Sequence, residues 1–160
     1  MTVHILATGT SRGIGRAVAS RLTSPATRFI GHASKGGDAA TIAADLALPG
    51  AAATLWQAAL DRLDGRIDVL VNNAGIFEAA PIDLPDAAWT EAWERTMRIN
   101  LTASAELCRL AVRHFQARGG GGRIVNVASR AAYRGDSPAH WHYAASKAGM
   151  VAMTKSIARG

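Results

Sequence analysis

Several features that mark other classes of protein are scarce or missing in this sequence of 160 residues. Its single cysteine, Cys108, cannot form an internal disulfide, which fits a reducing compartment, and the helix-like stretch around it predicts a small core residue. No apolar run is long enough to span a bilayer. The first residues lack the basic start and the cleavage site of a signal peptide, so we expect a cytoplasmic location.

Clustered charge is missing as well. The formal net charge is +6, but the Lys and Arg residues are scattered singly along the chain rather than gathered in a basic run. This distribution argues against a nucleic-acid-binding surface and indicates only a mild attraction for anionic ligands. The pair His140 and His142 has no cysteine or acidic cluster beside it, so no metal site is expected.

The sequence does contain a regular alternation of short apolar runs and helical stretches. Strands are predicted at Val3–Ala7, Arg28–Gly31, Thr41–Ala44, Ile67–Val71 and Ile124–Ala128, and helices at Gly15–Leu22, Ala51–Leu63, Pro85–Arg118 and from a cap at Ser137-Pro138 toward Gly160. Such alternation predicts an α/β fold with a parallel sheet covered by helices on both faces. Nothing in the sequence suggests a second domain, so residues 1–160 are expected to form one.

A glycine-rich turn joins the first predicted strand to the first helix. It reads TGTSRGIG at residues 8–15, so its glycines are spaced G-x-x-x-G-x-G. A dinucleotide diphosphate needs backbone that it can approach closely and helix amide groups that point at it. Gly9, Gly13 and Gly15 meet both needs, and we predict a dinucleotide-binding turn. An ordinary tight turn is the alternative.

The end of the second strand indicates which dinucleotide is preferred. An NAD site would offer a carboxylate to the ribose hydroxyls there, but the sequence has HASK at residues 32–35, and the nearest carboxylate is Asp38. Arg12 and Lys35 are two cations suited to a 2′-phosphate, so NADP(H) is preferred and NAD(H) is kept as an alternative. The other interpretation is that both are plain surface charges.

A second group of residues carries acid–base chemistry. Tyr143 and Lys147 are four residues apart on a predicted helix, so the ammonium can lie beside the phenol, lower its pKa and make it a general acid or base. Ser129 follows the fifth strand, at the end of the sheet where ligands bind, and can orient a substrate carbonyl. Taken alone, Ser129 would be interpreted as a capping serine.

Asn100 is unusual because asparagine is a poor helix former. It lies on the apolar stripe of the Pro85–Arg118 helix, which should be buried. A buried amide needs hydrogen-bond partners, so we expect a functional contact with water or with backbone.

The chain resembles the short-chain dehydrogenase/reductase superfamily, in particular members like the 3-oxoacyl-acyl-carrier-protein reductases. Four motifs occur in the right order: TGTSRGIG at residues 8–15, NNAG at 72–75, Ser129 after IVNVA, and YAASK at 143–147. The resemblance spans nearly the whole chain. It implies a Rossmann-type doubly wound parallel sheet and an NAD(P)-dependent oxidoreductase that interconverts a ketone or aldehyde and an alcohol by hydride transfer.

The resemblance also implies roles for individual residues. Tyr143 would donate the proton to the carbonyl oxygen, Ser129 would position that oxygen, Lys147 would tune Tyr143 and hold the nicotinamide ribose, and Asn100 would anchor a water. These four are the expected catalytic residues. The expected cofactor-binding residues are Gly9, Ser11, Arg12, Gly13, Ile14, Gly15, Lys35, Asp45, Leu46, Asn73, Ala74, Gly75, Tyr143 and Lys147.

The resemblance leads to one further expectation, about completeness. Members of the family continue with two more strands and a substrate lid, whereas this sequence stops about where the Tyr143 helix should end. We therefore expect a C-terminally incomplete domain of about five strands, whose last strand is an unprotected edge. A non-catalytic nucleotide-binding or interaction protein is the alternative to an enzyme acting on a small carbonyl or alcohol. The family also implies a homo-oligomer through Pro85–Arg118 and the final helix.

Overall fold

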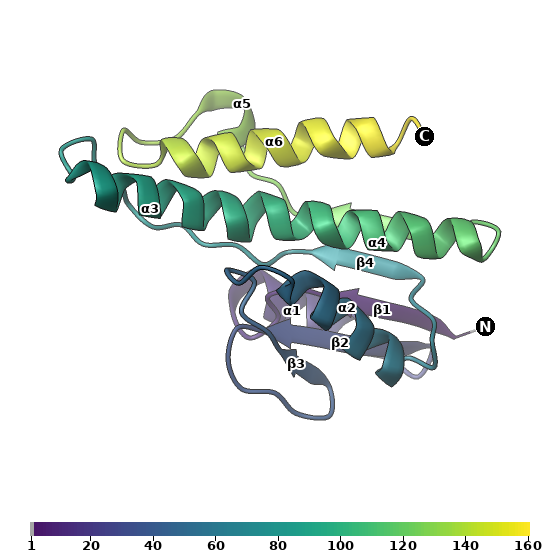
Figure 1. Ribbon diagram of the computed structural model, residues 1–160. Helices are drawn as coiled ribbons and strands as arrows, with labels where there is room; N and C mark the ends of the chain where they lie inside the picture. Colours follow the sequence, from purple (N-terminus) through teal and green to yellow (C-terminus); the bar gives the residue numbers. More distant parts are fainter. Residues whose placement is uncertain (1) are drawn as a thin grey trace. The chain divides into compact units, whose positions relative to one another are not determined.

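The computed structural model describes residues 2–160 (Figure 1). These residues form two compact units. Unit 1 comprises residues 2–74 and 106–127, and unit 2 comprises residues 75–105 and 128–160. The chain therefore passes from one unit to the other after Ala74, Ala105 and Val127. Each unit is described by itself.

Unit 1 is built on a parallel sheet. Its described strands are β1 (Val3–Ala7), β2 (Thr27–Ala33), β3 (Thr41–Ala43), β4 (Val69–Asn72) and β5 (Arg123–Asn126). They lie in the order β3-β2-β1-β4-β5, and every neighbouring pair is parallel. The chain thus fills the sheet outward from β1 in one direction and then in the other. Such a reversal of strand order is where α/β proteins bind ligands.

Helices cover both faces of this sheet. Ile5 and Ala7 of β1 pack with Val18 and Leu22 of α1 (Gly13–Leu22) on one face. Side chains alternate along a strand, so the fully buried Leu6 points to the other face. Helix α2 (Ala51–Arg62) and the unit 1 part of α4 (Ala103–Ala117) contact each other through the rings of Trp56 and His114. The doubly wound α/β prediction is therefore confirmed.

A charged cluster lies at the amino end of β4. The carboxylate of Asp68 accepts hydrogen bonds from the His4 N–H at 3.0 Å, from Arg118 Nη1 at 2.8 Å and from Arg66 Nε at 2.9 Å. Burial alone would raise the pKa of Asp68, but these hydrogen bonds outweigh it and hold the pKa well below its ordinary value. With its carboxylate charged, Asp68 thus connects β1, the amino end of β4 and the carboxyl end of α4.

Unit 2 consists of packed helices. Helix α3 (Asp86–Met97) continues into the π-helical turn η1 (Arg98–Thr102), and both pack against α6 (Trp141–Ile157). The short helix α5 (Ala131–Arg134) also packs on α6. The contact between η1 and α6 is close at Gly149, where a Cβ atom would lie 2.8 Å from Leu101 Cδ2. Among residues 2–160, no helix is long and apolar enough to cross a membrane.

Three details differ from the sequence-based expectation. The Pro85–Arg118 stretch is helical, but η1 interrupts its α-helical hydrogen bonding around Asn100. Ser137-Pro138 does not begin the last helix: α6 starts at Trp141, and the Ser137 hydroxyl instead bonds His140 Nδ1 at 2.7 Å. Helix α5 was not expected. The prediction that β5 is an edge strand is confirmed.

Candidate active site

The turn after β1 is connected to the turn after β4 within unit 1. The Thr8 hydroxyl accepts hydrogen bonds from the backbone N–H groups of Asn73 and Ala74, at 3.0 and 2.9 Å. The Asn73 side chain donates in return to the carbonyl oxygens of Thr8 and Gly9, both at 3.0 Å. The glycine-rich motif and the NNAG motif therefore form one rigid edge at the carboxyl ends of β1 and β4.

The three glycines of the turn have different reasons to lack a side chain. A Cβ at Gly9 would lie 2.7 Å from Ala74 Cα, and a Cβ at Gly15 would run into the Gly9 carbonyl oxygen. Gly13 has φ +53° and nothing within 4 Å of its Cβ position, so its backbone faces open space. Gly9 and Gly15 therefore allow close packing of the turn, whereas Gly13 leaves a surface that a ligand can approach.

Helix α1 begins at this open surface. Its N-cap residue is Arg12, no side chain caps its first amide groups, and its first turn contains no acidic residue. Ser11, Arg12 and Ile14 are exposed around it. Free N–H groups and a positive helix terminus beside a bare glycine fit the diphosphate of a dinucleotide.

His32 is a site residue whose role sequence reasoning missed. The residue is 3% exposed, and burial lowers the pKa of His32, although a hydrogen bond to Ala44 and the charge of Asp45 oppose this shift. Nδ1 lies 3.2 Å from the Gly9 amide nitrogen, which donates to it, so Nε2 carries the proton and donates to the Ala44 carbonyl oxygen at 2.8 Å. A polar residue inside an apolar strand was the available signal.

The expected adenosine side lies in the same unit. Lys35 is exposed after β2, and the Asp38 carboxylate accepts a hydrogen bond from the Ala40 N–H at 2.8 Å within its own turn. The Asp45 carboxylate likewise accepts from the Ala47 N–H at 3.0 Å, while Leu46 is buried.

In unit 2, Asn100 holds a loop segment through both ends of its amide. Its Oδ1 accepts from the Ile76 N–H at 2.8 Å, and its Nδ2 donates to the Ile76 carbonyl oxygen at 3.0 Å and to Ser146 Oγ at 3.3 Å. The side chain is completely buried in η1. Of the two contacts expected for Asn100, the contact with backbone is observed. A π-turn is a common feature of functional sites, because it re-aims side chains on a helix.

The amine of Lys147 lies in the same cluster. Lys147 is 4% exposed, and burial lowers the pKa of its ammonium. Its Nζ is 5.9 Å from the centre of the Tyr143 ring, so the pair shares one face of α6 as predicted. A Cβ at Gly75 would lie 3.3 Å from Asn100 Oδ1 and 3.7 Å from Lys147 Nζ. The last glycine of NNAG therefore makes room for this cluster.

The Tyr143 ring has aromatic neighbours that the sequence did not reveal. Phe77 meets it edge-on, with ring centres 4.7 Å apart and an angle of 82°. His140 stacks flat on Phe77 at 3.9 Å and 5°. Phe77 lies two residues beyond NNAG, in a loop with no periodic pattern, so no sequence signal placed it near the phenol.

Ser129 lies just before α5 in unit 2. Its hydroxyl accepts a hydrogen bond from the Ala131 N–H at 3.2 Å, as a capping serine does. The interpretation as a capping residue therefore has direct support, and the role at a substrate carbonyl stays a prediction. Within the described chain, no group of three or more His, Cys, Asp or Glu residues could hold a metal ion.

The comparisons with known proteins establish the family. The model of the short chain dehydrogenases matches residues 3–160, so this chain belongs to that family. Its sheet and helices are accordingly an NAD(P)-binding Rossmann fold. An aldohexose dehydrogenase from Thermoplasma acidophilum, solved in ligand-free form, has the same fold with a TM-score of 0.85 and 28% identity, over 99% of this chain and 61% of that one.

Two sequence relatives show the range of the family. A 3-oxoacyl-[acyl-carrier-protein] reductase of Synechocystis sp. is 33% identical, over 96% of this chain and 66% of that protein. A 3beta-hydroxysteroid dehydrogenase of Eggerthella lenta is 32% identical, over 96% of this chain and 63% of that protein. The chain thus spans just under two thirds of the length of these relatives, whose names indicate very different substrates.

Proposed function

We propose that this chain carries the cofactor cradle and the acid–base residues of an NADP(H)-dependent oxidoreductase that interconverts a ketone or aldehyde and an alcohol. The observation that carries the proposal is the cluster in unit 2, where Asn100, Ser146, Lys147 and Tyr143 share one continuous set of contacts. A buried amine beside a phenol is the arrangement that acid–base catalysis at a carbonyl requires.

The proposed role of each residue follows from the chemistry of its side chain. A bound nicotinamide cofactor would supply the hydride. Tyr143 gives its hydroxyl proton to the carbonyl oxygen in reduction and takes it back in oxidation. The ammonium of Lys147 favours the phenolate that is left, because opposite charges attract strongly in a buried site. Ser129 donates a hydrogen bond to the same oxygen once its hydroxyl turns from the cap toward substrate.

The preference for NADP(H) rests on charges in unit 1. Arg12 and Lys35 are exposed cations, whereas the Asp38 carboxylate is engaged in its own turn. A 2′-phosphate would be attracted to the two cations, and a bare 2′-hydroxyl would find no carboxylate at the end of β2. NADPH should therefore bind more tightly than NADH, and the difference should shrink as salt is added.

Two wider expectations join this proposal. The cytoplasmic location stays a prediction from the sequence. Homo-oligomerisation through the α3–η1–α4 stretch and α6 is expected because members of the family pair these helices. Neither affects the acid–base chemistry assigned to Tyr143.

The test is the Tyr143→Phe variant, compared with Tyr133→Phe. These are the two tyrosines of the chain, and Tyr133 on α5 is 76% exposed. NADPH binding is followed by its fluorescence and turnover by NADPH consumption with a panel of ketones and aldehydes. We expect Tyr143→Phe to lower kcat/KM about 1,000-fold while NADPH binding persists, because only proton transfer is lost.

Two outcomes would count against an enzyme. Full activity in Tyr143→Phe would remove the phenol from the mechanism. NADPH binding by the unmodified chain with no turnover of any carbonyl would favour the alternative, a nucleotide-binding protein derived from the family.

A further inference from the structure

We propose that Phe77 and His140 form an aromatic wall beside Tyr143 that selects substrates with an aromatic ring attached to the carbonyl or carbinol carbon. This proposal rests on the function assigned to Tyr143 above and adds the substrate class. The wall is defined by these two side chains, and both lie in unit 2 with the phenol.

The wall is held in place from several sides. Asn100 fixes the peptide of Ile76, the residue next to Phe77, through two hydrogen bonds. The Ala80 N–H donates to the Ala139 carbonyl oxygen at 2.8 Å, which joins the Phe77 loop to the loop before α6. His140 is held in turn by Ser137 at 2.7 Å. The two stacked rings are therefore part of a preformed surface, and a ligand would not have to organise them.

Part of the aromatic wall is exposed and accessible to a ligand. Phe77 remains 56% exposed even with His140 and Tyr143 against it. The nearest charged side chain in sequence, Glu78, is paired with Arg95 at 3.4 Å. A free aromatic surface touching the phenol favours a neutral planar group over a polyol, whose hydroxyls need hydrogen-bond partners.

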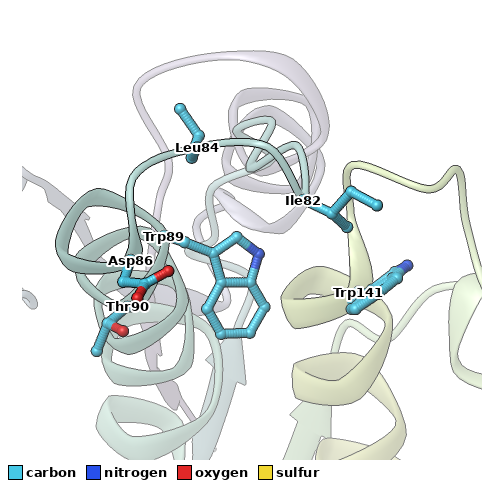
Figure 2. Close-up of a pocket in the computed structure, with 6 residues that line it drawn as sticks. All are labelled: Ile82, Leu84, Asp86, Trp89, Thr90 and Trp141. Atoms are coloured by element: carbon cyan, nitrogen blue, oxygen red, sulfur yellow. The ribbon is translucent and has the colours of Figure 1, made fainter.

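A second aromatic site in unit 2 provides the rival location. A cavity of about 330 Å³ is lined by Trp89 of α3 and Trp141 of α6 together with Ile82 and Leu84 (Figure 2). Trp141 and Tyr143 are two residues apart on α6, so their side chains point to different sides of the helix. Ring selection that depends on this cavity would therefore not require contact with Tyr143.

The test uses ligands that differ in whether a six-membered ring is aromatic and flat or saturated: 1-phenylethanol and 1-cyclohexylethanol for binding, and the matching methyl ketones for turnover. Binding is measured by ligand-observed NMR on the full chain in the presence of NADP⁺. The unmodified chain should bind the phenyl compound about 10-fold more tightly than the cyclohexyl one, the upper range for an aromatic pair. Phe77→Ala and Phe77→Leu should both abolish that ratio, and His140→Ala should reduce it. Trp141→Leu should leave it unchanged.

The outcomes separate this proposal from the function on which it rests. A phenyl preference that survives Phe77→Leu, or that is lost in Trp141→Leu, would overturn the proposed wall. The proposal would also be overturned if the unmodified chain bound both alcohols equally or bound neither. Equal loss of both ligands in Phe77→Leu would reduce Phe77 to a packing role and also overturn it. Turnover of both ketones without a ring preference would leave the oxidoreductase standing and remove only the wall. A ring preference in binding without any turnover would support the wall and remove the oxidoreductase function.

Discussion

The two units bury polar side chains in opposite ways. In unit 1 the buried centre is a carboxylate, Asp68, with two arginines and a backbone N–H directed at it. In unit 2 it is a neutral amide, Asn100, bonded to the Ile76 backbone and to the Ser146 hydroxyl. Near it lies the amine of Lys147, and burial lowers the pKa of this amine.

The difference between the clusters is one of electrostatic balance. The Asp68 cluster favours the charged state of its central residue, so it stabilises the fold. Burial lowers the pKa of Lys147, so we expect its positive charge to cost stability in unit 2. Perturbed groups of this second kind are typical of functional sites. Three substitutions test this contrast, taken from the largest expected effect to the smallest.

The Asn100→Ala substitution should have the largest effect. It leaves the N–H and C=O of Ile76 without partners and releases the loop that carries Phe77, so both stability and activity should fall. We expect a loss of about 3 kcal/mol in the free energy of unfolding, from the uncompensated buried groups, and a fall of about 100-fold in kcat/KM from misplaced catalytic groups. Urea denaturation and steady-state kinetics measure the two losses.

Asn126→Ala provides the comparison for Asn100. It also removes an amide contact, the partly buried 2.9 Å hydrogen bond between Asn72 Nδ2 and Asn126 Oδ1, but in unit 1. Stability should fall without a comparable fall in kcat/KM per folded molecule. If Asn100→Ala lost stability alone in the same way, the amide would be a structural clamp with no part in the site.

Asp68→Asn should come next, with a loss of about 2–3 kcal/mol at neutral pH, because two arginines lose their buried partner. The pKa of Asp68 is lowered in the folded chain from its ordinary 3.8. Its contribution is therefore fully present above pH 3.8 and is lost as the pH falls below it. Urea denaturation at a series of pH values should show a weaker acid dependence in the variant than in the original chain.

Asp64→Asn is the matched surface control. Asp64 pairs with Arg28, but its side chain is 68% exposed, so water screens the interaction. Its loss should be below about 0.5 kcal/mol. An Asp68→Asn variant no less stable than Asp64→Asn would show that the buried cluster gains nothing from its geometry.

The sequence predicted most of the sheet, because strand residues carry an apolar pattern that burial on both faces requires. Val3–Ala7 was predicted to the residue, and each end of the other described strands lies within two residues of its predicted position, the usual uncertainty at element ends. The π-turn at Arg98–Thr102 was not predictable in this way, since it depends on the packing of η1 against α6 rather than on periodicity. The start of α6 was misplaced for a related reason: Ser137 looks like a cap, yet its hydroxyl bonds a side chain, His140.

The sequence predicted those features of the candidate site that depend on residues a few positions apart on one helix. Tyr143 and Lys147 share a helix face because they are four residues apart, and Asn100 was expected to be buried from its place on the apolar stripe. Contacts made across long sequence separations carried no such signal. The stacking of His140 on Phe77 and the hydrogen bond from Gly9 to His32 each join residues that no local pattern relates. The cofactor and catalytic roles themselves stay predictions for the experiments above.

Of the three substitutions, Lys147→Met is expected to have the smallest effect on stability, and an effect of opposite sign. Methionine fills a similar volume without a buried charge, so the variant should be more stable than the original chain by about 1 kcal/mol at neutral pH, while turnover is lost. The pKa of Lys147 is lowered in the fold from its ordinary 10.5. The original chain should therefore gain stability as the pH rises toward 10.5, and the difference in stability between it and the Lys147→Met variant should become smaller. Thermal unfolding without cofactor measures both trends, with Lys155→Met on the exposed side of α6 as a control near zero. A Lys147→Met variant that is less stable at every pH would mean that the contacts of the ammonium outweigh its burial, and the contrast between the two clusters would then disappear.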